Sequence, residues 1–205
     1  FKNNQLTFII RDNHIDEWKE EEREHALSGK FVSKEEEERE REKFKPTFTT
    51  VSLTWLNANE NARVIVQNED RTEYLFPNHE VKGRGFAKSI RCKGYKKLII
   101  KELYPGVDAH YSFTERNGGF KYALHVSPNA DVSKIKFQYS GDIKKVLKSS
   151  TGKLIVNTYD GNIEEDAPFS YDKSTKTEIP SSFKVNENYI ISFDVENTSN
   201  GIVID

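Results

Sequence analysis

Alternation of apolar and polar residues along several short segments is the feature that most restricts what this chain can fold into. Apolar side chains occupy every second position through most of segments 48–55, 120–126, 135–139 and 189–195. A period of two places alternate side chains on opposite faces of a strand, so each segment predicts a strand with one buried face. Sheets that bury one face and expose the other are typically antiparallel.

Turn residues separate these segments at short intervals. The turn motifs are Asn117-Gly118, Ser140-Gly141-Asp142, Thr151-Gly152 and Asp160-Gly161-Asn162. Asn-Gly and Asp-Gly tolerate the positive φ angles of tight hairpin turns. We therefore expect residues 107–116 to pair with residues 119–126, and residues 153–159 to pair with the segment after Asn162.

The number and spacing of these segments predict the fold class. About a dozen strand candidates of this length and spacing indicate an all-β, mostly antiparallel, β-sandwich-like fold. A chain of 205 residues is long enough to bury a sizeable core without disulfides. We expect one β-rich module over residues 1–205, with two β subdomains, 1–102 and 103–205, as the alternative.

A strongly charged segment near the N-terminus departs from the strand pattern. Between Glu17 and Lys43 there are 11 acidic and 7 basic residues. Ser33 and Glu36 have the spacing of a helix capping box, and strong helix formers follow them. This predicts a charged helical insert over residues 16–43. It is either a solvated insert or an arm that docks a partner.

A basic stretch over residues 82–101 contains eight cations and no acidic residue. The candidate polyanion-binding residues in it are Lys82, Arg84, Lys88, Arg91, Lys93, Lys96 and Lys97. Binding of a polyanion there would release counterions and would therefore weaken as salt increases. In the alternative interpretation Lys96, Lys97 and Lys101 face solvent at a sheet edge, where lysine discourages aggregation, or the acidic insert neutralises the basic stretch.

Residues suited to catalysis or metal binding are few. Cys92 is the only cysteine, which excludes an internal disulfide and a multi-cysteine metal site. His79-Glu80 begins like a zinc-binding helix, but Gly83 stands where the second histidine is required. His110 and His125 are expected to face each other across a hairpin, without a third zinc ligand. We therefore predict no catalytic residue, no metal and no cofactor.

The second half of the chain carries an ordered set of motifs. They are Tyr104-Pro105-Gly106-Val107-Asp108, Gly118-Gly119-Phe120-Lys121-Tyr122, Val126-Ser127-Pro128-Asn129-Ala130-Asp131, Tyr139-Ser140-Gly141, Gly152-Lys153-Leu154, Ala167-Pro168 and Ile202-Val203-Ile204-Asp205. In order and spacing the set resembles the domain of unknown function near the N-terminus of large secreted, Bacteroidetes-type bacterial proteins. Many of those proteins continue into SBBP β-propeller repeats or end in a gliding-motility-associated sorting domain. The match is weaker over residues 51–59, and the charged insert is not part of it.

The resemblance implies a largely β fold and an extracellular or cell-surface location, and it implies no catalytic residues. The chain begins at Phe1 and contains no methionine. We therefore expect a processed or trimmed piece of a longer protein that continues beyond Asp205. Neither nucleic-acid binding nor membrane insertion is expected.

These observations favour a non-enzymatic structural or adhesion-type module of a larger bacterial surface protein. Its expected partner is a polysaccharide or a cell-surface protein. The alternative is a carbohydrate-binding module, either with aromatic residues stacking on sugar rings or with the basic stretch holding an acidic polysaccharide. The candidate stacking residues are Trp55, Tyr111 and Tyr171, and core positions are the alternative for each of them. A glycoside hydrolase-like enzyme is the less favoured third interpretation, because sequence does not supply the separation between two carboxyl groups that such an enzyme needs.

Overall fold

A computed structural model describes residues 4–12, 19–20, 23–24, 27–29, 33, 39, 47–75, 90–113 and 120–205. The described part is all-β, and its paired strands are antiparallel. The fifteen strands are β1 (Gln5–Asp12), β2 (Thr47–Trp55), β3 (Arg63–Leu75), β4 (Ile90–Tyr104), β5 (Val107–Phe113), β6 (Phe120–Val126), β7 (Lys136–Gly141), β8 (Ile143–Lys148), β9 (Leu154–Thr158), β10 (Asn162–Glu165), β11 (Ser170–Asp172), β12 (Glu178–Ile179), β13 (Ser182–Val185), β14 (Ile190–Asp194) and β15 (Ile202–Ile204). The predicted all-β, antiparallel class is confirmed.

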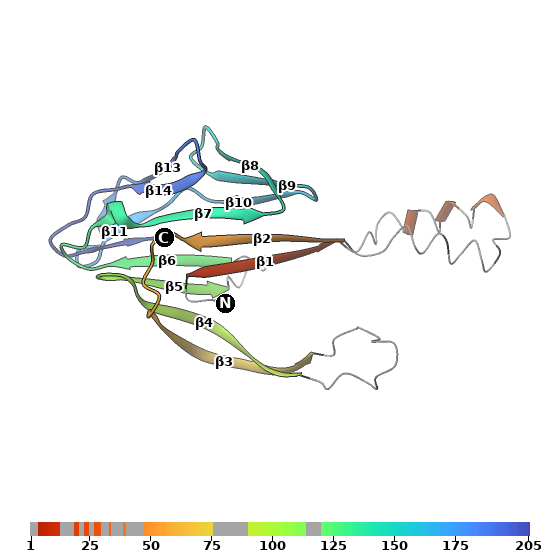
Figure 1. Cartoon of the computed structure of the whole chain (residues 1–205), viewed down its shortest axis with the longest axis horizontal. Coiled ribbons are helices and arrows are strands. Elements are labelled where there is room, and N and C mark those ends of the chain that lie inside the picture. The colour runs from red at the N-terminus through yellow and green to blue at the C-terminus, as the bar shows by residue number, and fades with distance from the viewer. Residues whose placement is uncertain are drawn as a thin grey trace.

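The strands form three sheets (Figure 1). A five-stranded sheet has the order β1-β2-β7-β14-β13, and a seven-stranded sheet has the order β12-β11-β15-β6-β5-β4-β3. A three-stranded sheet, β10-β9-β8, completes the structure. Aromatic rings join the two larger sheets face to face: the ring centroids of Trp55 and Tyr122 are 5.5 Å apart, and those of Phe8 and Phe120 are 5.8 Å apart.

The expected hairpins form where the turn residues predict them. β5 pairs with β6, and β9 pairs with β10. Along β6 the buried residues are Leu124 and Val126, while Lys121 lies on the opposite face. The turn motif at residues 117–118 lies outside the described residues.

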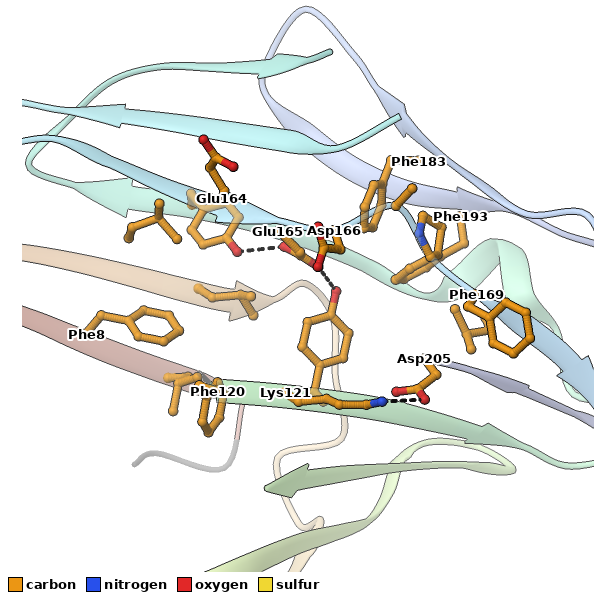
Figure 2. A pocket seen from close by; sticks show the side chains of 18 residues that line it. Phe8, Phe120, Lys121, Glu164, Glu165, Asp166, Phe169, Phe183, Phe193 and Asp205 are labelled. Atoms are coloured by element: carbon orange, nitrogen blue, oxygen red, sulfur yellow. Dashed lines mark hydrogen bonds and ion pairs between the residues drawn. The ribbon is translucent and has the colours of Figure 1, made fainter. Parts of the chain in front are cut away.

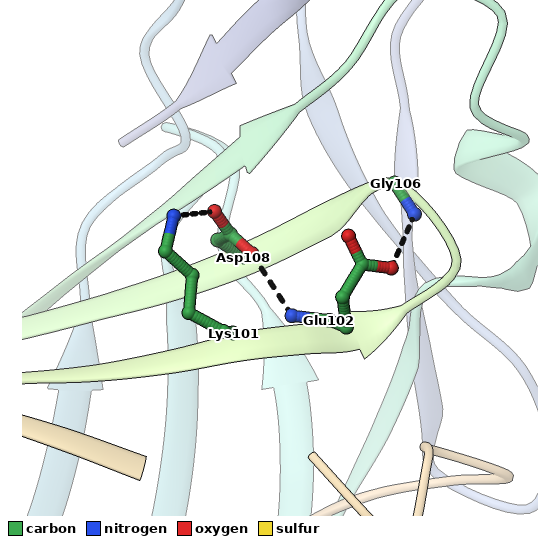
Figure 3. A network of polar contacts seen from close by, with 4 residues as sticks. All are labelled: Lys101, Glu102, Gly106 and Asp108. Carbon is green, nitrogen blue, oxygen red and sulfur yellow. Dashed lines mark hydrogen bonds and ion pairs between the residues drawn. The ribbon is translucent and has the colours of Figure 1, made fainter. Parts of the chain in front are cut away.

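The turn between β4 and β5 is held by acidic side chains (Figure 3). Gly106 takes a φ of +74°, which glycine adopts without steric cost. Its N–H donates to the Glu102 carboxylate at 3.1 Å, and the Glu102 N–H donates to the Asp108 carboxylate at 2.9 Å. Lys101 pairs with the same aspartate at 2.5 Å. These contacts fix the irregular end of the hairpin, where the pairing register shifts between Ile100 and Tyr104.

A second glycine allows the end of β7 to approach β2 closely in the five-stranded sheet. Gly141 has a φ of +103°, and a Cβ atom placed on it would lie 2.3 Å from the carbonyl oxygen of Thr50. Asp142 accepts a hydrogen bond from the Thr50 N–H at 2.8 Å. Any larger residue at 141 would therefore push the end of β7 away from β2.

One hydrophobic core runs through both halves of the chain. It includes Trp55 from β2 and Leu124 from β6, together with Phe137 from β7. β2 from the first half pairs with β7 from the second, and the boundary at residue 102 falls inside β4. The described residues on both sides of that boundary share the same sheets and the same core.

The predicted charged helical insert over residues 16–43 is not found as a helix. No helix is delimited among its described residues, of which positions 19–20, 23–24, 27–28 and 39 have helical backbone. The other residues of the predicted insert lie outside the described residues.

Replacing Phe137 by Ala is expected to lower the free energy of unfolding by about 3–5 kcal/mol, because the ring is fully buried and its loss leaves a cavity. Urea denaturation followed by far-UV circular dichroism measures the change. Ile9→Thr is the control, since Ile9 is 68% exposed and its loss should cost less than about 0.5 kcal/mol. Equal effects of the two substitutions would contradict the assigned core.

Candidate functional site

A cavity of about 650 Å³ lies between the two larger sheets, at the point where the chain passes from β10 to β11 (Figure 2). Strands of all three sheets contribute side chains to it. Aromatic residues are the largest group in the lining: Phe8, Phe120, Tyr122, Tyr139, Phe169, Phe183 and Phe193. A largely apolar cavity with a few polar groups is the usual form of a small-molecule site.

Glu165 at the end of β10 is the polar centre of this cavity. One carboxylate oxygen accepts a hydrogen bond from the Tyr139 hydroxyl at 2.8 Å, and the other accepts one from the Tyr122 hydroxyl (Figure 2). Burial raises the pKa of Glu165, and the two tyrosine hydrogen bonds oppose that rise. Burial together with this carboxylate also raises the pKa of both tyrosines, so they remain protonated donors.

The other carboxylates that line the cavity have cationic partners. Asp205 pairs with Lys121 at 2.6 Å, and Asp166 pairs with Lys153 at 2.7 Å. Lys153 also lies 4.0 Å from Glu164. Within the described ranges, Glu165 is the one lining carboxylate without an ion pair.

The sequence analysis missed Glu165, although a signal was present. Ile163 and Glu165 are two residues apart on β10 and so lie on the same face of the strand. Ile163 packs against the core, which places Glu165 on the inward face as well. The surrounding run of charged residues hid this alternation.

The predicted polyanion site is resolved only in part. Lys82, Arg84 and Lys88 lie outside the described residues, and Arg91 lies in β4. Lys93 pairs with Glu69 at 3.0 Å. The neighbours Lys96 and Lys97 fall on opposite faces of β4, because side chains alternate along a strand.

The alternative interpretation of these lysines is corrected by the sheet order. β4 lies between β3 and β5, so Lys96, Lys97 and Lys101 are not at a sheet edge. Lys101 is bound to Asp108 in the hairpin described above. The edge position belongs instead to β3.

The two histidines expected to face each other do so. The rings of His110 on β5 and His125 on β6 stack with centroids 3.9 Å apart and an angle of 25° between the ring planes. Burial lowers the pKa of both, with Lys97 adding to the effect at His110. At His125, burial and then His110 lower the pKa to about 4. The pair is therefore uncharged near neutral pH.

Metal binding finds no candidate cluster in the described part of the chain. No group of three or more His, Cys, Asp or Glu side chains lies close enough there to hold a metal ion. His79, Glu80 and Gly83 lie outside the described residues, and Cys92 lies in β4.

Two of the three candidate sugar-stacking residues belong to the core, so the core alternative holds for them and they are excluded as stacking platforms. Trp55 is fully buried and Tyr111 is 2% exposed. The Trp55 indole N–H donates to the Tyr111 hydroxyl at 2.6 Å. Tyr171 is half-buried, with the Lys176 ammonium 5.1 Å from its ring centroid.

Glu165→Gln is expected to change how stability depends on pH. Because the folded-state pKa lies above the ordinary value of 4.5, Glu165 favours folding most below pH 4.5, and this contribution is lost as pH rises through the raised pKa. The variant should not show this decrease in the free energy of unfolding with rising pH, which is on the order of 1 kcal/mol in the wild type. Urea unfolding from pH 4 to pH 8 measures it, and Glu164→Gln should retain the wild-type profile. A wild-type profile in the Glu165 variant would contradict the assignment.

His125→Gln is expected to act in the opposite pH direction. The folded-state pKa lies below the ordinary 6.5, so the neutral ring contributes stability above pH 6.5 that is lost as pH falls toward about 4. With partial exposure allowed for, the effect is on the order of 1 kcal/mol. The variant should lose less stability between pH 7 and pH 4, and NMR titration of the ring protons gives the pKa directly. A ring that titrates near 6.5 would be inconsistent with the stacked pair.

Comparison with known proteins identifies the family of the chain but no individual related protein. No helix in the described part of the chain is long and apolar enough to cross a membrane. No curated protein and no solved structure matches the chain significantly. A family model matches residues 1–205, which is the full length of the sequence. The chain therefore belongs to the family described as "Domain of unknown function (DUF7948)".

Proposed function

We propose that the chain is a non-enzymatic β-sandwich module that serves as a structural or adhesive element of a larger secreted or cell-surface bacterial protein. The observation that carries this proposal is the aromatic core that joins the two larger sheets. Phe137 alone has ring contacts with Tyr122 across the interior and with Trp55, Phe183 and Phe193 within its own sheet. A core of this kind gives the rigidity that a spacer or adhesive module requires.

The long hairpin of β3 and β4 supports an adhesive role. Its strands have 13 and 15 residues, and in Figure 1 they curve away from the five-stranded sheet. β3 is the last strand of the seven-stranded sheet, and Val64 and Val66 on it are 37% and 42% exposed. An edge strand with exposed apolar side chains is suited to pairing with an extended segment of a partner.

The setting that we propose follows from the family resemblance. The motifs from Leu103 to Asp205 resemble the N-terminal domain of bacterial proteins that carry SBBP β-propeller repeats or gliding-motility-associated sorting domains. We extend to this chain the exported location and the longer parent polypeptide of those proteins. In that setting the module would present a protein-binding edge at the cell surface.

Carbohydrate binding is the second candidate, and one exposed aromatic pair favours it. Phe169 is 50% exposed, and its ring centroid lies 6.0 Å from that of Tyr171. Two neighbouring rings on one face provide an apolar surface that a sugar ring can cover. This pair replaces the buried Trp55 and Tyr111 as the candidate platform.

The two candidates are separated by a glycan array and a bacterial cell-binding assay, both at low and high salt. Adhesion through β3 predicts cell binding without glycan binding, and Val64→Lys/Val66→Lys should reduce cell binding at least tenfold, because lysines at a sheet edge discourage strand pairing. Phe169→Ala is the matched control and should bind cells like the wild type. Glycan binding that Phe169→Ala removes would favour the second candidate instead. Absence of binding in both assays, by folded protein, would contradict the adhesive role.

A further inference from the structure

The cavity at Glu165 combines two features that together select one kind of ligand. Seven of its eighteen described lining residues are aromatic, and its polar centre is a carboxylate that has no ion pair among the described residues. The faces of aromatic rings carry partial negative charge and attract cations. Both features therefore favour positive charge inside the cavity.

The unpaired state of Glu165 contrasts with its neighbours. Asp205 has Lys121 as partner, and Lys153 serves Asp166 and approaches Glu164. Among the described lining residues Lys121 is the one cation, and its ammonium is already engaged. Partial removal of a carboxylate from water without a counter-charge is costly, so a cation entering beside the half-buried Glu165 would be stabilised.

Access to the carboxylate runs from a negatively charged rim. Among the lining residues, Glu164, Asp166 and Phe169 are exposed and form this rim, whereas Tyr139, Phe183 and Phe193 are buried. Glu165 remains only half-buried, because part of its surface faces the cavity. A cation is thus attracted at the rim and meets rings and a carboxylate further in.

We propose that this cavity binds a small organic cation, with an ammonium or quaternary ammonium group beside Glu165 and an apolar body against the phenylalanine rings. Neutral apolar molecules would gain the ring contacts but leave the carboxylate unpaired. Anions would meet Glu165 and the acidic rim and be repelled. A cavity of about 650 Å³ is large enough for a head group of this kind with an aromatic or short aliphatic substituent.

Isothermal titration calorimetry on the full chain tests the proposal with three probes. The first is benzyltrimethylammonium. The second and third are choline and its neutral carbon analogue 3,3-dimethyl-1-butanol, which match in shape and differ in charge. We expect the two cations to bind and choline to bind at least tenfold more tightly than its neutral analogue.

Variants assign the binding to the cavity. Glu165→Gln keeps the size of the side chain and removes its charge, so it should weaken binding of benzyltrimethylammonium at least tenfold. Glu164→Gln, which removes a rim carboxylate one residue away, should change it less than about threefold. Affinity in the wild type should rise with pH as Glu165 ionises, and this rise should be absent in Glu165→Gln.

Three results would overturn the proposal. The first is equal affinity for choline and 3,3-dimethyl-1-butanol, which would mean that charge is not recognised. The second is undiminished binding in Glu165→Gln with an unchanged melting temperature, which would place the site elsewhere. The third is no heat of binding for either cation with folded protein when the cation reaches about 10 mM. That concentration is about tenfold above a Kd of 1 mM, the order of the weakest specific affinities.

Discussion

Trp55 is buried between the two larger sheets, and its indole N–H donates a hydrogen bond to the Tyr111 hydroxyl of β5 at 2.6 Å. A polar atom buried without a partner costs about 1–3 kcal/mol, so the ring is held where that bond can form. Because Trp55 ends β2 and Tyr111 lies in the opposite sheet, the bond fixes how the two sheets are placed relative to each other. The rings of Tyr122 and Phe137 then pack around the indole.

Tyr122 connects this packing to the cavity. Its ring lies edge-on to Trp55 in the core, while its hydroxyl donates to Glu165. A change in the charge of Glu165 therefore acts on a side chain that is also part of the core. The interior thus has an aromatic part and a polar part, and Tyr122 belongs to both. Stability of the fold and occupancy of the cavity are therefore linked.

The alternation of apolar and polar residues and the turn residues predicted much of the fold. They failed where a residue's environment depends on how strands distant in the sequence pack together. Alternation located the strands around Leu124 and Phe137, and Asp-Gly located the turn after Thr158. The same alternation shows which residues share a face of a strand, but not which face packs against another sheet. It is therefore equally compatible with Trp55 in the core and Trp55 on the surface. Whether Lys96 lies at a sheet edge depends on β3 pairing beside it, which no local signal gives. For Glu165, the strand alternation predicts an inward side chain, whereas its charge predicts an exposed one. Only the packing of the sheets decides between these two positions.

The position of β15 has a consequence for how the chain is synthesised. β15 lies between β6 and β11 in the seven-stranded sheet, although β7 to β14 separate it from β6 in the sequence. During synthesis one edge of β6 therefore stays open until β15 has been made, and an open edge is a template for wrong pairing. β15 is the last of the fifteen described strands, so a nascent chain of this family must be kept from associating through β6 until the other fourteen have been made.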